Sequence, residues 1–204
     1  MIRRSNSPCE SECPQFKVIL VGDVAVGKTS IANYQIHKSF DYLIPQTNGS
    51  SHLRTKVMVD NTEVELMIWD TAGQEEFAPL VPLYLQNSSV CIIVASCLNT
   101  ESCEHIRKWK QIINESIETP KIILAINKID LLEGDFTSYT QEIIAKYNND
   151  IPKIFFTSAK NGTNIESLFK EIGREALSSQ PNGFNTNFTS FSEMPTNASQ
   201  NKCC

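Results

Sequence analysis

A glycine-rich run near the start of the chain has the residue types and spacing that bind phosphate. Two glycines are separated by four residues and followed by a lysine and a hydroxyl residue, in the run Gly22-Asp23-Val24-Ala25-Val26-Gly27-Lys28-Thr29. Glycines let backbone N–H groups surround an anion, Lys28 can reach the outer phosphates of a nucleotide, and the Thr29 hydroxyl can bind Mg²⁺. A chance match in a glycine-containing turn is the alternative, but an apolar run at 16–21 precedes the loop and a helical pattern at 29–37 follows it. This setting predicts a phosphate-binding loop between a strand and a helix.

A second group of candidate residues follows the apolar run at 64–69. Asp70 could hold the water shell of Mg²⁺, Gly73 could offer a backbone N–H to a terminal phosphate, and Gln74 could orient an attacking water. Asp-x-x-Gly alone is weak evidence, because both residues are common in turns. With the loop upstream, the motif makes Lys28 and Gln74 the catalytic candidates.

A third motif, Asn127-Lys128-Ile129-Asp130, predicts the choice of base. A carboxylate accepts two parallel N–H bonds, and guanine has two neighbouring N–H donors where adenine does not, so Asp130 selects guanine by leaving a buried carboxylate unpaired with any other base. Asn127 can bond the other edge of the base or tie loops together, and the Lys128 stem can cover its face. In the later run Thr157-Ser158-Ala159-Lys160, the Ala159 N–H can meet the guanine carbonyl. A solvated turn after a strand is the alternative for the Asn-Lys-x-Asp tetrad.

The elements that must hold these motifs alternate between strand-like and helix-like patterns. Apolar runs predict strands at 16–21, 53–59, 64–69, 90–95, 122–126 and 153–156. Helical patterns occupy 29–37, 75–85, 104–117, 139–147 and 165–177. Asp60-Asn61 between the second and third strands indicates a hairpin, and so one antiparallel strand. The order predicts an α/β fold of three layers, a mostly parallel six-stranded sheet with helices on both faces and ligands at the carboxyl ends of its strands.

Composition narrows the classes of protein that fit. The chain has 204 residues, 41% of them hydrophobic, and a formal net charge of -5. No cluster of Lys and Arg stands out, so we expect no nucleic-acid partner. No apolar stretch approaches the ~20 residues that span a bilayer, and the start of the chain lacks a signal-peptide core, so we expect a cytosolic protein.

The seven cysteines do not have the spacing of a disulfide framework or a zinc site. Cys91, Cys97 and Cys103 lie in or beside an apolar run and are predicted to be small core residues. Cys9 and Cys13 lie in a polar leader without partnering histidines.

In this order, each after a strand, the three motifs resemble those of the Ras superfamily of small GTPases over about 16–177. Within it, Trp69-Asp70-Thr71-Ala72-Gly73-Gln74-Glu75-Glu76-Phe77 and the terminal Cys203-Cys204 resemble the Rab family. The resemblance implies a P-loop NTPase G domain at 15–177, after a flexible leader at 1–14. It implies Mg²⁺ ligands at Thr29, Thr47 and Asp70, with Thr47 engaged only when the γ-phosphate is present. The residues implied for GTP and GDP are Asp23, Val24, Ala25, Val26, Gly27, Lys28, Thr29, Ser30, Phe40, Thr47, Gly73, Asn127, Lys128, Asp130, Ser158, Ala159 and Lys160, with Phe40 packing against the base.

The resemblance also implies a cellular role. A Rab-like protein is a monomeric switch that binds and hydrolyses GTP, regulates vesicle traffic and cycles between the cytosol and an endomembrane. Its expected partners are an exchange factor, a GTPase-activating protein, a dissociation inhibitor or escort protein, and effectors.

The tail at 178–204 is rich in Ser, Asn, Gln and Thr, which predicts disorder. In the Rab context Cys203 and Cys204 are expected to carry two geranylgeranyl groups, since one lipid binds a membrane only marginally and this tail lacks a basic supplement. The alternative is a pair of idle thiols. Phe184, Phe188 and Phe191 fall at helix spacing, either as a docking motif or as scattered aromatics.

Three departures from the family pattern affect the interpretation. Val24 stands where Ras-like proteins have glycine, near the expected γ-phosphate and Gln74, which favours a second hypothesis of a GTP-binding module that hydrolyses poorly. The segment Asn48-Gly49-Ser50-Ser51-His52 is more polar than usual in Rabs, and Ser96-Cys97 replaces a frequent Tyr-Asp. A third hypothesis, a P-loop kinase or ATPase, is disfavoured by Asp130.

Overall fold

A six-stranded sheet in the order β2-β3-β1-β4-β5-β6 forms the centre of the molecule. The computed structural model describes residues 13–73, 79–116 and 119–179. The strands are β1 (Gln15–Val21), β2 (Ser50–Val59), β3 (Thr62–Thr71), β4 (Val90–Ser96), β5 (Lys121–Asn127) and β6 (Ile154–Phe156). Every pairing is parallel except β2 with β3. The predicted fold class is confirmed, with one antiparallel strand at the edge.

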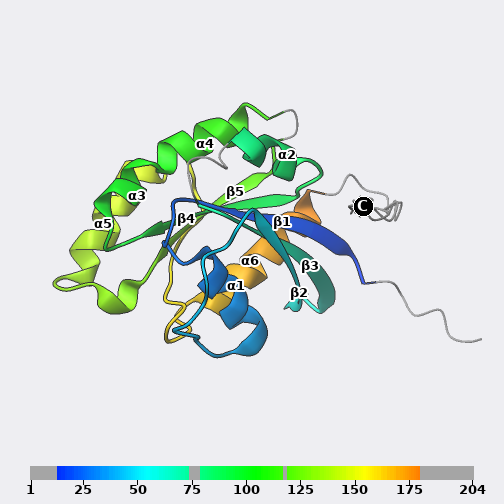
Figure 1. Cartoon of the computed structure of the whole chain (residues 1–204), viewed down its shortest axis with the longest axis horizontal. Helices are drawn as coiled ribbons and strands as arrows, with labels where there is room; N and C mark the ends of the chain where they lie inside the picture. Colours follow the sequence, from blue (N-terminus) through cyan, green and yellow to red (C-terminus); the bar gives the residue numbers. More distant parts are fainter. Residues whose placement is uncertain (1–12, 74–78, 117–118, 180–204) are drawn as a thin grey trace, which may run out of the picture.

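Helices cover both faces of this sheet (Figure 1). They are α1 (Lys28–His37), α2 (Val81–Leu85), α3 (Thr100–Glu104), α4 (Ile106–Asn114), α5 (Phe136–Tyr147) and α6 (Ile165–Ser178), with a 3₁₀ turn η2 (Ile129–Leu131) after β5. Figure 1 shows α1 and α6 on one face and α2, α3, α4 and α5 on the other. None of the helices in the described ranges is long and apolar enough to cross a bilayer.

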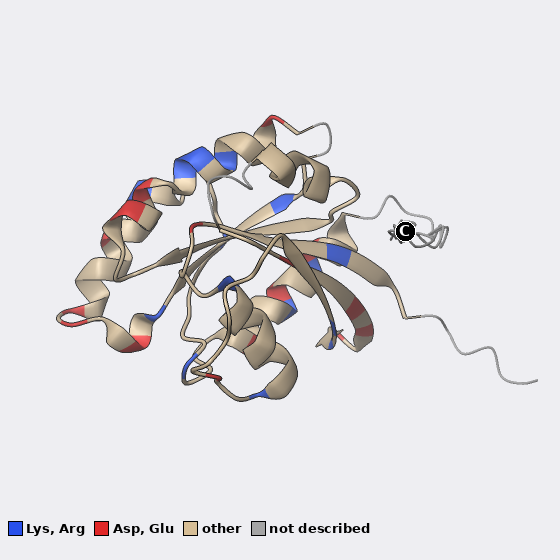
Figure 2. Ribbon diagram, viewed as in Figure 1, with Lys and Arg blue, Asp and Glu red and all other residues tan. Residues whose placement is uncertain are grey.

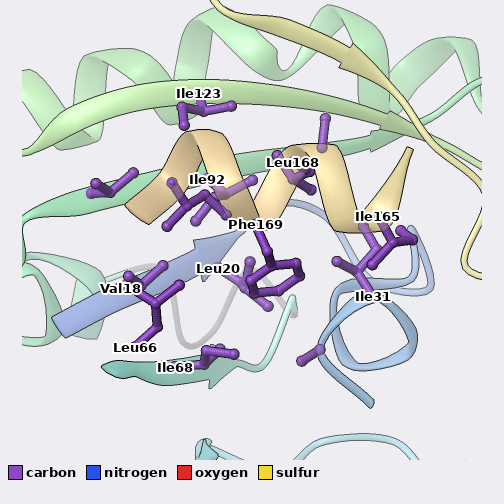
Figure 3. Packing of buried hydrophobic residues seen from close by; sticks show 14 of the residues in the cluster. Val18, Leu20, Ile31, Leu66, Ile68, Ile92, Ile123, Ile165, Leu168 and Phe169 are labelled. Carbon is purple, nitrogen blue, oxygen red and sulfur yellow. The ribbon is translucent and has the colours of Figure 1, made fainter. Parts of the chain in front are cut away.

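The two faces have separate hydrophobic cores, because side chains alternate along each strand. On the α1/α6 face, Val18, Leu20 and Ile92 pack with Phe169 and Leu168 of α6, as Figure 3 shows. The intervening strand residues Ile19, Cys91 and Ile93 belong to the other core, with residues of α2, α4 and α5. Strands buried on both faces explain why the sequence shows continuous apolar runs.

The hairpin between β2 and β3 turns at Asp60 and Asn61, which both have positive φ, 45° and 69°. Two such residues match the tight turn that suits the twist of paired strands. The strand β2 starts at Ser50, three residues before the predicted range, because Ser50 still pairs with Thr71. Most of the polar segment 48–52 is therefore edge strand.

One predicted helix is divided in the structure. The pattern at 104–117 predicted a single helix, but α3 begins at Thr100 and a turn at His105 separates it from α4. The earlier start has a local cause, since the Asn99 side chain caps α3 by accepting the Ser102 N–H. The end of the predicted range, 117, lies outside the described residues, as do 75–78 of the helix predicted at 75–85.

Two of the three cysteines predicted for the core, Cys91 and Cys103, are buried. The prediction is wrong for Cys97, which is only half-buried and donates its thiol to the Lys128 carbonyl at 3.1 Å. Burial, and secondarily Asp130, raises the pKa of Cys97 to about 11.

Charged residues are dispersed over the fold (Figure 2). Lys and Arg lie on strands, helices and loops, interspersed with Asp and Glu. The expectation that the chain has no nucleic-acid partner stays a prediction.

Candidate nucleotide site

A cavity of about 540 Å³ lies where β1 and β3 end, at the carboxyl edge of the sheet. Ten of the residues predicted to bind nucleotide line it: Val24, Ala25, Gly27, Lys28, Thr29, Ser30, Phe40, Thr47, Gly73 and Lys128. The structure thus gathers residues from three predicted motifs around one space. The location is the one expected for a ligand of a parallel α/β sheet.

The loop 22–27 has a backbone shape that depends on glycine. Gly27 has a φ of 100°, and a Cβ there would lie 2.3 Å from Nδ2 of Asn127. The next residue starts α1, whose N-terminus has no side-chain cap and no acidic residue in its first turn. Its first N–H groups lack the usual side-chain acceptor, which favours an anion at this end of the helix.

The ammonium group of Lys28 is buried next to this helix start. Lys28 is only 5% exposed, and its Nζ donates to the carbonyls of Gly22 at 2.9 Å and Asp23 at 2.8 Å. Burial lowers the pKa of Lys28 to about 8, against the opposing effect of Asp70 and Asp23. A buried cation with only neutral acceptors in direct contact is suited to receiving an anion.

Three oxygen-bearing side chains from separate segments meet beside Lys28. Thr29 Oγ1 donates to Asp70 Oδ2 at 2.7 Å and lies 2.9 Å from Thr47 Oγ1. Thr47 Oγ1 lies 3.3 Å from the same carboxylate oxygen. The three residues predicted to bind metal are therefore together, although 41 residues of sequence separate Thr29 from Asp70.

The buried carboxylate of Asp70 indicates that this cluster fits a cation. It is fully buried, and Oδ1 is the only buried side-chain N or O atom of the described residues that has no hydrogen-bond partner. Burial raises the pKa of Asp70. The hydrogen bond from Thr29, the charge of Lys28 and the hydrogen bond from Thr47 oppose this rise. An orphaned carboxylate oxygen among hydroxyl groups fits a hard divalent cation such as Mg²⁺, which prefers oxygen ligands.

Gly73 lies against the phosphate-binding loop. A Cβ at Gly73 would fall 2.4 Å from the Asp23 carbonyl oxygen and 2.5 Å from Lys28 Nζ. No other residue type fits without moving the loop, so the segment after β3 begins in direct contact with it. The catalytic candidate Gln74 comes next in sequence and lies outside the described residues.

Asn127 ties three loops together at the end of β5. It is 1% exposed; Nδ2 donates to the Val26 carbonyl at 3.0 Å, and Oδ1 accepts the Ala159 N–H at 3.2 Å. Thr157 donates to the same oxygen at 3.3 Å. Of the two roles predicted for Asn127, the structure shows the loop-tying one. Val26 is itself a buried core residue.

Asp130 lies in η2, close to the loop after β6. Ser158 Oγ donates to Asp130 Oδ1 at 2.5 Å, and Lys160 Nζ lies 4.0 Å from Oδ2. Its neighbour Lys128 has a φ of 68° and lines the cavity, whereas Asp130, Ser158, Ala159 and Lys160 do not. Ser158 and Lys160 thus contact the Asp130 carboxylate, and the intervening Ala159 is bonded to Asn127.

Several lining residues were not predicted. They are Asp41, Tyr42, Ile44, Pro45, Gln46 and Thr71. Most lie between Phe40 and Thr47, both of which were predicted, so the position of the segment was the available signal. The side chain of Asp23 points elsewhere, to His105 and Trp109, 82 and 86 residues away, and no local pattern indicates such contacts.

Comparison with known proteins agrees with the nucleotide site that the geometry indicates. A model of the Ras family matches residues 17–178. The chain is 35% identical to human Ras-related protein Rab-31 over 93% of this chain and 97% of that protein. It is 37% identical to human Ras-related protein Rab-22A, over 82% and 87% of the two chains. The match to the Ypt/Rab-type GTPase YPT7 of Saccharomyces cerevisiae is 34%, over 79% and 81%. The chain therefore belongs to the Ras family and, within it, to the Rab small GTPases, enzymes that hydrolyse GTP to GDP.

Proposed function

We propose that this Rab GTPase is a Mg²⁺-dependent switch that regulates vesicle traffic from a lipid-anchored position on an endomembrane. The observation that carries the switch is the contact of Thr47 with Thr29 and Asp70. It connects the loop 40–47 to the phosphate-binding loop and to the end of β3. A ligand that changes this contact changes the position of the loop.

The chain's own residues supply most of the chemistry of the proposed site. Lys28 neutralises phosphate charge, the N-terminus of α1 donates backbone N–H groups, and Asp130 selects guanine. Thr29, Thr47 and Asp70 would hold Mg²⁺, which when bound offsets the charge on the outer phosphates. Gln74 is proposed to orient the attacking water.

Val24 supports a second candidate function, a module that keeps GTP bound because hydrolysis is slow. Its side chain is 47% exposed and lines the cavity together with Gly73 and Lys28. An isopropyl group there shares the space in which Gln74 or an activating arginine would act. The GTP-bound state, and the recruitment of effectors, would then persist.

Traffic and membrane attachment are inferred from the family. The relatives are named as Rab and Ypt/Rab-type GTPases, which supports endomembrane cycling with an exchange factor, an activating protein, a dissociation inhibitor and effectors. The lipid is proposed at Cys203 and Cys204, which lie outside the described residues.

Release of a fluorescent GDP analogue, mantGDP, tests the switch. Purified full-length protein should hold mantGDP for minutes or longer in Mg²⁺ and release it at least about tenfold faster in EDTA, because a Mg²⁺ ion held by Thr29 and Asp70 would offset the charge of the bound phosphates. The control variant Ser138→Ala changes a hydroxyl on α5, away from the cavity, and should respond as the wild type does. Equal release rates with and without EDTA would contradict the proposed Mg²⁺ site.

A further inference from the structure

The side chain of Asp23 is held by the junction of α3 and α4. Its Oδ2 lies 2.8 Å from Nδ1 of His105, and its Oδ1 accepts the indole N–H of Trp109 at 2.8 Å. A carboxylate can only accept hydrogen bonds, so Nδ1 of His105 carries the proton. Each carboxylate oxygen thus has its own donor.

Packing and hydrogen bonds hold the two donors, His105 and Trp109, in place. His105 and Trp109 are four residues apart, which brings them to one side of the helix. The backbone N–H of Trp109 donates to the His105 carbonyl at 3.0 Å. Trp109 is 5% exposed and packs in the core with Ile106 and Ile113. Just upstream, the Ser96 N–H at the end of β4 donates to Ser102 Oγ at 3.0 Å. The junction is therefore attached to the sheet at both ends.

The backbone of the same Asp23 contacts the catalytic end of the site. Its carbonyl accepts the Lys28 ammonium group at 2.8 Å. It is also the group that a Cβ at Gly73 would meet at 2.4 Å. Asp23 thus contacts the α3–α4 junction through its side chain, and Lys28 and Gly73 of the nucleotide site through its backbone carbonyl.

We propose that His105 and Trp109 are positioning residues for the phosphate-binding loop. By holding the carboxylate of Asp23 they fix its carbonyl, which keeps Lys28 directed into the loop and slows the release of bound nucleotide. The inference rests on the proposed binding of phosphate in this loop. It assigns a role in nucleotide retention to a surface of α3 and α4 that is remote in sequence from the nucleotide motifs.

The release of mantGDP from the full chain in Mg²⁺ tests this role. His105→Ala and Trp109→Phe each remove one donor and should speed release by about tenfold. The reason is that the net free energy of a hydrogen bond to a charged group corresponds to a factor of about ten or more. His105→Asn keeps a side-chain N–H near the position of Nδ1 and should restore slow release. The control Glu104→Ala alters the exposed neighbour of His105 and should leave the rate unchanged.

His105 and Trp109 could also have a structural role that does not involve the loop. To distinguish the two roles, both substitutions are repeated in an Asp23→Ala background, or in Asp23→Asn if the alanine variant does not fold. If His105 and Trp109 act through Asp23, neither change should speed release further by more than about twofold. Unchanged release in the single variants, or undiminished acceleration without Asp23, would overturn the inference.

A readout without nucleotide keeps this test distinct from that of the proposed function. Failure of the wild type to bind mantGDP would contradict the proposed function. In that case the NMR signal of the Trp109 indole N–H, identified by its loss in Trp109→Phe, still tests the contact. It should shift in Asp23→Ala, and an unmoved signal would overturn the inference.

Discussion

Buried polar atoms in the nucleotide site are chiefly partnered by one another. Lys28 is held by two backbone carbonyls, Asn127 has three partners, and one oxygen of Asp70 is bonded by Thr29. The unpartnered Oδ1 of Asp70 is the exception among the described residues. A buried polar atom without a partner costs free energy, so a bound cation at this oxygen would recover part of that cost.

Asp130 provides the first prediction at the scale of a residue. Asp130→Asn replaces an acceptor oxygen by an N–H donor, so it should lower GDP affinity at least about 100-fold and favour xanthosine diphosphate, whose ring has a carbonyl where guanine has an amine. Titration of both labelled nucleotides measures the change. Retained preference for GDP in the variant would contradict the role of Asp130.

Val24 provides the second. Val24→Gly should raise the single-turnover rate of GTP hydrolysis by about tenfold or more, because misplacement of reacting groups by ~1 Å can cost ~10²-fold. In the wild type, Gln74→Leu should then add little further loss. Rapid-quench assays with and without an activating protein decide the point, and equal rates for wild type and Val24→Gly would mean that the valine does not obstruct catalysis.

At the scale of elements, the site is built where loops from β1, β3, β5 and β6 meet. Asn127 joins three of these loops. The buried strands and the Asp60-Asn61 hairpin were predictable, because hydrophobic runs and turn chemistry are local signals. The starts of β2 and α3 were not, since they depend on the pairing of Ser50 with Thr71 and on the Ser102 contacts with Ser96 and Asn99.

In the candidate site too, features with a local sequence signal were predictable and contacts between distant residues were not. The phosphate-binding loop and the candidate Mg²⁺ ligands were predictable from motif spacing and resemblance, and the structure brings Thr29, Thr47 and Asp70 together. The contacts of Asp23 with His105 and Trp109 were not, because they join residues more than 80 positions apart and no local pattern indicates them.

Asn127 tests the linkage between elements. Asn127→Ala should lower the free energy of unfolding by about 2–3 kcal/mol, since it leaves the Val26 carbonyl and the Ala159 N–H without their buried partner. It should also speed GDP release. Urea unfolding with bound GDP measures the first effect, and Asn114→Ala, an exposed asparagine on α4, is the control. Equal midpoints for Asn127→Ala and wild type would contradict the structural role.

At the scale of the whole molecule, the nucleotide site and the exit of the tail lie at opposite edges of the sheet. The cavity is at the carboxyl ends of β1 and β3. Ser178 and Ser179, at the end of α6, share a second pocket with Ser89 and Lys121, which lie at the start of β4 and β5. The last described residue, Ser179, therefore lies at the edge of the sheet opposite the nucleotide cavity.

The anchor itself is the prediction at this scale. Cys203→Ser/Cys204→Ser should move a tagged protein from the membrane to the soluble fraction and leave nucleotide binding unchanged, because two prenyl chains are needed for stable attachment. Cell fractionation measures the distribution, and Cys13→Ser, at a free cysteine just before the predicted domain, is the matched control. A double variant that stays on membranes would show that another anchor exists.

The choice of nucleotide tests the central claim most directly. Full-length protein loaded with mantGDP in Mg²⁺ is challenged with increasing GTP, GDP or ATP, and the remaining fluorescence is recorded at equilibrium. The arrangement of Lys28, Asp70 and Asp130 predicts that GTP and GDP displace the label at similar concentrations, whereas ATP needs at least about 10⁴-fold more. Displacement by ATP at a concentration comparable to GTP would contradict the account.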